Sequence, residues 1–123
     1  MPSAREDYLL RLIQQLSGAL ARLRERLSGP SAGMEAEDIA RDAGREITRL
    51  LGPQALLLQQ LDATSAVRIV ADPQRVAFWV AFLRVQAAAD RLRGRVDAAQ
   101  RTEVRAAAIE RAAKVAWSEV PNA

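Results

Sequence analysis

Residues 8–27 read YLLRLIQQLSGALARLRERL, and the spacing of the aliphatic residues in this stretch predicts a long amphipathic helix. Six of its large aliphatic residues follow one another at alternating steps of four and three: Leu9, Ile13, Leu16, Leu20, Leu23 and Leu27. This is the heptad spacing of a helix that lies along another helix. We expect the helix to span residues 4–27, with Ser3 as its N-cap and Glu6 completing a capping box.

Two interpretations of this leucine seam are open from the sequence. The seam either packs against the rest of the chain and closes its core, or it pairs with a second copy or a partner protein. A helix with leucine at nearly every seam position is suited to both. The specific form that we predict is a homodimer in which all six seam residues anchor the partner helix, with Arg11, Arg22 and Arg26 at the rim.

The rest of the chain reads as helices separated by clear breaks. Gly29 and Gly33 flank Pro30 in the first break, Gly52-Pro53 ends one helix and starts the next, and Asp72-Pro73 repeats the start signal. The predicted helices after the first one are residues 34–51, 53–61, 65–70, 73–93 and 96–120. We therefore expect one all-α domain over residues 1–123. It has about six helices, two of them short, and a helical body over residues 34–120. Its predicted arrangement is a tetratricopeptide-like hairpin array or an irregular bundle behind the leucine-rich helix.

The composition narrows the possible chemistry. The chain has no Cys and no His, so it lacks the thiolates and imidazoles that most often hold transition metals, and it lacks the commonest general base. We expect no metal, no cofactor, no small-molecule substrate and no enzymatic activity. No apolar run approaches the length that spans a bilayer, and the start does not resemble a secretory signal, so a cytoplasmic location is expected.

The aromatic residues are few, and most of them point to a core. Phe78, Trp79 and Phe82 fall on one broad apolar face of the predicted helix 73–93, which makes this helix the expected centre of packing. Trp117 has two open interpretations, because it is placed either to cover the end of the core or to dock on a partner.

Clusters of charged residues suggest an alternative function, which is binding to nucleic acid. The acids Glu35, Glu37, Asp38 and Asp42 lie beside arginines, so we interpret them as a charged helix start and a salt-bridged surface rather than a metal site. The arginines near the last two predicted helices suggest phosphate contacts in a nucleoprotein assembly: Arg91, Arg93, Arg95, Arg101 and Arg105. The scarcity of aromatic residues available for base stacking makes nucleic acid the second choice after a protein partner.

Two resemblances add to this interpretation. With Gly94 at the turn, the last predicted hairpin resembles a tetratricopeptide repeat, with Ala87, Ala99 and Ala106 at its small positions, although Gln86 and Asp90 depart from the pattern. The segment DYLLRLIQQL at residues 7–16 resembles the opening of a small bacterial family of helical proteins with tetratricopeptide-like bodies and no established function. That resemblance implies a fold and a bacterial origin, and it supplies no activity.

Overall fold

The computed structural model describes residues 3–118, and the regular secondary structure of these residues is helical throughout. The all-helical class predicted from the sequence is confirmed. The elements are α1 (Ala4–Ser28), α2 (Ala32–Leu51), a 3₁₀ turn η1 (Gly52–Gln54), α3 (Ala55–Gln60), α4 (Ala63–Val70), α5 (Pro73–Leu92) and α6 (Val96–Ser118).

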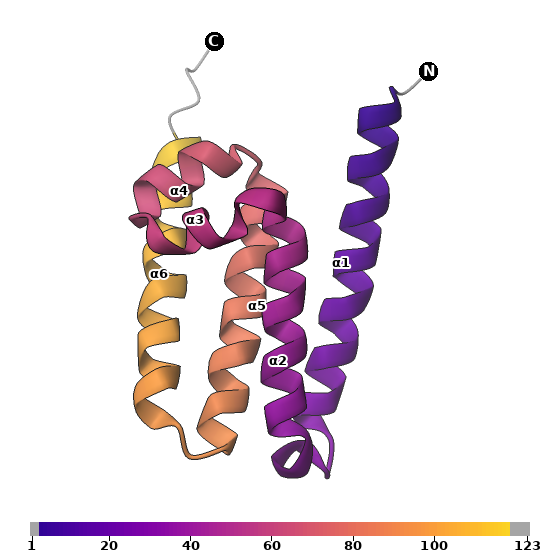
Figure 1. Cartoon of the computed structure of the whole chain (residues 1–123), viewed down its shortest axis with the longest axis vertical. Coiled ribbons are helices and arrows are strands. Elements are labelled where there is room, and N and C mark those ends of the chain that lie inside the picture. Colours follow the sequence, from indigo (N-terminus) through magenta and orange to yellow (C-terminus); the bar gives the residue numbers. More distant parts are fainter. Residues whose placement is uncertain (1–2, 119–123) are drawn as a thin grey trace.

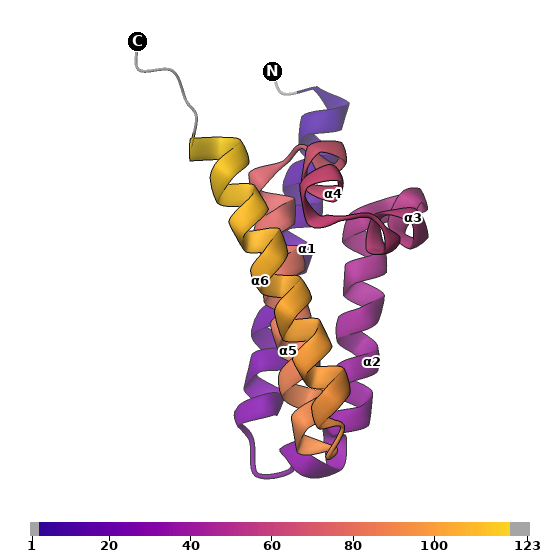
Figure 2. The same ribbon diagram turned by 90° about the vertical axis from the view of Figure 1, so that its left-hand side faces the viewer.

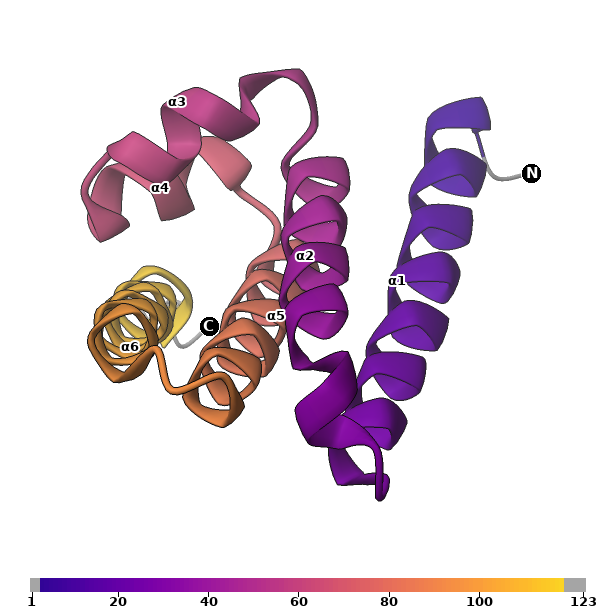
Figure 3. The same ribbon diagram turned by 60° about the horizontal axis from the view of Figure 1, so that its bottom comes forward.

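The four long helices run along the length of the molecule, and α3 and α4 lie across one end (Figures 1 and 2). The helices α2 and α5 pack closely on each other at the centre. The N-terminal helix α1 packs on both of them, α6 packs on α5, and α4 covers α6. The view in Figure 3 places α1 and α6 at opposite sides of this central pair. Among the described helices, this arrangement leaves one side of α1 without a neighbour.

Side chains cap the starts of α1, α4 and α5. The Ser3 hydroxyl accepts a hydrogen bond from the Glu6 amide at 3.1 Å, and the Glu6 carboxylate accepts one from the Ser3 amide at 3.2 Å, so the predicted capping box forms. The carboxylate of Asp62 accepts from the Ser65 amide, and that of Asp72 accepts from the Gln74 amide. Asp62 is therefore the N-cap of α4.

The helix ends differ from the predicted ones by a few residues. The second helix starts at Ala32 rather than at residue 34, because Ser31 takes the N-cap position and the chain needs only three residues to turn back. The segment 53–61 begins as a 3₁₀ turn, in which Gly52 has a positive φ of 76°. The last helix is described as far as Ser118, so its predicted end at residue 120 and the tail from Pro121 lie outside the described residues.

The predicted centre of packing on α5 is confirmed. Trp79 and Phe82 are fully buried, and they belong to one hydrophobic core with residues of α1, α2, α4 and α6. The guanidinium of Arg105 lies 5.6 Å from the centre of the Trp79 ring and donates a hydrogen bond to the Leu58 carbonyl at 3.1 Å. Arg105 thus joins α6 to the end of α3, and its burial lowers the pKa of the guanidinium.

Gly18, in the middle of α1, does not lie against another of the described helices. A close neighbouring helix would explain a residue that lowers helix stability by about 1 kcal/mol. A Cβ built on Gly18 meets only the Arg22 guanidinium of the same helix, at 3.2 Å. No neighbouring helix within the described residues therefore requires glycine at this position.

Candidate functional site

The leucine seam of α1 divides into two parts. Leu16, Leu20 and Leu23 are buried in the hydrophobic core, and Leu27 is half-buried against it. The structure thus uses the C-terminal part of the seam to close the core of its own chain. Substitutions in this part will affect folding before they affect association.

The N-terminal part of the seam is more open. Leu9 and Ile13 are half-buried and lie outside the set of residues that forms or directly covers the core. Leu10, one position off the seam, is 58% exposed, and Tyr8 is exposed on another side of the helix. This end of α1 stands away from α2 and α5 in Figure 1. The chain therefore presents aliphatic side chains that its own core does not use.

A series of residues along one side of α1 defines a surface that we call the outer stripe. Its members are spaced by three or four residues, which places them on one side of a helix: Glu6, Leu10, Ile13, Ser17, Ala21 and Arg24. Ile13 is half-buried and the other five are exposed. The large aliphatic residues lie in its N-terminal half and the small residues in its C-terminal half. The heptad pattern does not single out Leu10, Ser17 and Ala21, because they lie beside the seam and not on it.

Two of the three arginines predicted for the rim, Arg11 and Arg26, have polar contacts within the chain. Arg26 donates hydrogen bonds to Glu35 at 3.1 Å and to Asp42 at 2.9 Å, and so connects α1 to α2. Hydrogen bonding to Asp42 and Glu35 raises the pKa of Arg26. The Nε of Arg11 donates to the carbonyl of Asp7 on its own helix. Arg22 is exposed and lies with Arg26 in a depression between α1 and α2.

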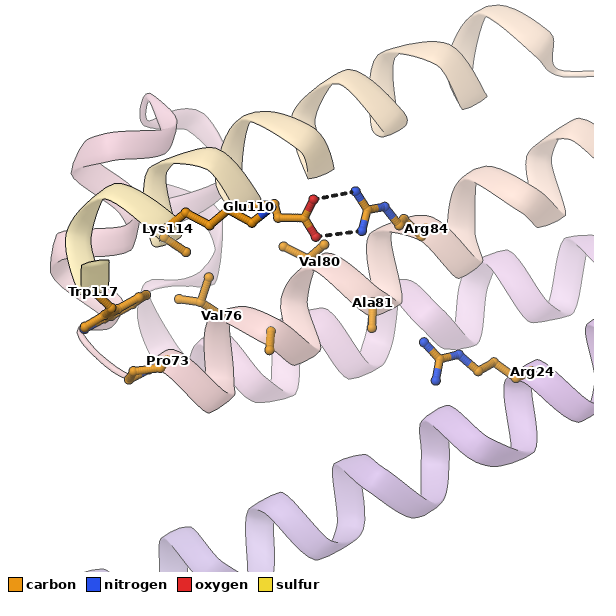
Figure 4. Close-up of a pocket in the computed structure, with 11 residues that line it drawn as sticks. Arg24, Pro73, Val76, Val80, Ala81, Arg84, Glu110, Lys114 and Trp117 are labelled. Atoms are coloured by element: carbon orange, nitrogen blue, oxygen red, sulfur yellow. Dashed lines mark hydrogen bonds and ion pairs between the residues drawn. The ribbon is translucent and has the colours of Figure 1, made fainter. Parts of the chain in front are cut away.

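A groove of about 370 Å³ lies between α6 and the Arg24 end of the outer stripe, with α5 as its floor (Figure 4). Four apolar residues of α5 make most of the floor: Val76, Ala77, Val80 and Ala81. Pro73 and Trp117 lie together at one end in Figure 4, and Arg24 reaches toward the groove from α1. Trp117 packs against the core, as one of its two interpretations from the sequence expects, and it also lines this groove.

Charged groups surround the apolar floor. Arg84 donates two hydrogen bonds to the Glu110 carboxylate, at 2.9 and 3.2 Å, which joins α5 to α6 across the groove (Figure 4). This pair lowers the pKa of Glu110 and raises that of Arg84. Arg24 and Lys114 add two further positive charges to the lining. The groove therefore combines an apolar floor with a net positive edge.

The arginines predicted for nucleic acid do not form one free cluster. Arg91 pairs with Glu103 at 3.5 Å, Arg93 pairs with Asp90 at 3.3 Å, and Arg105 is held beneath α3 as described above. Arg95 and Arg101 are exposed, and neither takes part in an ion pair within residues 3–118.

The acidic residues at the start of α2 act as partners of arginines. Glu35 and Asp42 hold Arg26, and Asp38 pairs with Arg41 one turn away. Within residues 3–118, no group of three or more Asp, Glu, His or Cys side chains is arranged to hold a metal ion. The helices of the described part of the chain also include none that is long and apolar enough to cross a membrane.

Comparisons with known proteins return no relative for this chain. No family model, no curated protein and no solved structure matches it. The outer stripe and the groove beside it are therefore interpreted from their geometry and chemistry.

Proposed function

We propose that this protein is a non-enzymatic interaction module that self-associates through the N-terminal half of α1, with a homodimer as the functional form. The observation that carries the proposal is the exposure of Leu10, together with the half-buried Leu9 and Ile13, at the end of α1 that stands away from the body. Burying a leucine side chain is worth about 1.5–3 kcal/mol, so covering these residues favours association.

The division of α1 supports this proposal. The buried leucines of α1, which begin at Leu12, fix the helix to α2 and α5, so that its first turns are held in a defined position. A preorganised docking surface loses less conformational entropy on binding than a disordered segment. The same helix thereby contributes to the core and presents an interface.

The proposal also includes the finer fold type, the family and the location of the protein. A tetratricopeptide-like packing of the α5–α6 hairpin is supported by Ala87, Ala99 and Ala106, each fully buried, and by Gly94, which turns the chain with a φ of 78°. Membership of the bacterial family with tetratricopeptide-like bodies, and a cytoplasmic location, accompany it as proposals. Nucleic-acid binding stays a prediction without a supporting observation, because three of its five arginines have partners within the chain.

The test is the molar mass in solution, measured by light scattering over a dilution series. The docked segment is short, so we expect micromolar affinity and a mass that approaches twice the 13.5 kDa of the chain at tens of micromolar. A mass that stays at that of one chain over the whole series would reject self-association. A gel-shift with DNA and RNA at low salt serves as the companion measurement, and it is expected to be negative.

A further inference from the structure

The outer stripe of α1 is self-complementary when two copies of the helix are laid antiparallel. Aligning Ile13 of one copy with Ser17 of the other brings Leu10 beside Ala21 and Glu6 beside Arg24. Because the pairing is reciprocal, each contact occurs twice about a two-fold axis near residue 15. This is the form that an isologous dimer interface requires.

The sizes of the side chains fit this register. Leu10 and Ile13 are large, and the residues that they meet, Ser17 and Ala21, are small and exposed. Large residues on one helix that fall on small residues of the other allow the two helices to approach closely. A parallel pairing would instead place Leu10 against Leu10 and Ser17 against Ser17, which leaves gaps between the small residues.

The charges fit it as well. Glu6 and Arg24 are about 27 Å apart along α1, at a rise of 1.5 Å per residue, so they cannot pair within one chain. Neither residue takes part in an ion pair within residues 3–118. The antiparallel register brings them together twice, whereas a parallel register opposes like charges at both ends.

The groove supports this pairing, because it meets the outer stripe at Arg24. Arg24 belongs both to the outer stripe and to the lining of the groove between α1 and α6 (Figure 4). A helix paired with the outer stripe therefore meets the groove at its Arg24 end, near Ala81 (Figure 4). The positive edge of the groove suits the acidic first turn of that helix, which carries Glu6 and Asp7.

We propose that a second copy of this chain docks on the outer stripe, with its first turn at the Arg24 end of the groove. The two α1 helices then pair antiparallel, with Ile13 on Ser17, Leu10 on Ala21 and Glu6 on Arg24. This inference rests on the proposed self-association and specifies its geometry. The dimer closes on itself, so it does not grow into longer assemblies.

The test uses engineered cysteines, to which the chain is suited because it contains none of its own. The single variants Ile13→Cys and Ser17→Cys are oxidised separately and as an equal mixture, and the disulfide-linked products are identified by mass. A disulfide needs Cα atoms within about 7 Å of each other. The antiparallel register therefore predicts that the mixed product, which links position 13 of one variant to position 17 of the other, forms well above its statistical share. It also predicts little product from either variant alone.

Disulfide formation between engineered cysteines also supplies the control and the outcomes that contradict the proposal. Met34→Cys, at a residue that is 90% exposed on α2, is mixed with Ser17→Cys to measure chance collisions between accessible thiols. Homodimers of each single variant in preference to the mixed product would show a parallel pairing and overturn the proposal. A mixed product no more abundant than the Met34→Cys control, from a protein that light scattering shows to be a dimer, rejects this register but not self-association. A monomeric mass at every concentration rejects both.

Discussion

Replacing Leu16 with Ala is expected to lower the free energy of unfolding by about 2–5 kcal/mol, the range for removing a large aliphatic side chain from a packed core. Leu16 is fully buried, and it lies in one core with residues of α2 and α5. Because small domains are stable by about 5–15 kcal/mol, the loss is a large part of the total. Urea unfolding followed by tryptophan fluorescence measures it, since Trp79 is buried in the folded protein.

The matched control for this prediction is Leu10→Ala, the same chemical change on the same helix. Leu10 is exposed in the single chain, so in dilute solution its truncation is expected to change the free energy of unfolding by no more than about 0.5 kcal/mol. An equal loss in the free energy of unfolding for the two variants would contradict the structure, in which Leu16 belongs to the core and Leu10 does not.

Replacing Leu10 with Asp is expected to weaken the dimer by two to four orders of magnitude in its dissociation constant. Each of the two symmetric contacts loses the burial of one leucine, worth about 1.5–3 kcal/mol, and tenfold in affinity corresponds to about 1.4 kcal/mol. The midpoint of the dilution series in sedimentation or light scattering measures the change. At tens of micromolar, the variant is expected to have the mass of one chain.

The control here is Val104→Asp, a change to the same acid at a residue of α6 that is 57% exposed. It introduces the same charge at an exposed position on another helix. It is expected to leave the dissociation constant unchanged. A loss of association in both variants would attribute the effect to net charge rather than to the outer stripe.

The helices and the central packing of α5 follow from local signals in the sequence. Pro73 after Asp72, the Ser3–Glu6 capping box and Gly94 act within a few residues, so their effect can be read without the fold. Helical spacing alone predicts Trp79 and Phe82 as core residues, and both are fully buried.

The division of the leucine seam does not follow from local signals. Leu9 and Leu23 are equivalent in the heptad pattern, and only the lengths and positions of α2 and α5 decide that Leu23 is buried while Leu9 is half-exposed. The contacts of Arg105 with Trp79 and with the Leu58 carbonyl also join residues far apart in the sequence. Such tertiary contacts explain why an arginine predicted for phosphate lies beneath α3.

The most direct test of the central claim is amide hydrogen exchange of the wild-type protein along α1, measured in dilute and in concentrated solution. The account predicts that residues 5–14 become more slowly exchanging as the concentration rises, because a second copy covers them. It predicts that residues 16–28 exchange slowly at both concentrations, because their side chains fix that part of the helix to its own core. Equal protection of residues 5–14 at both concentrations would contradict the claim that the open half of α1 docks on a second copy.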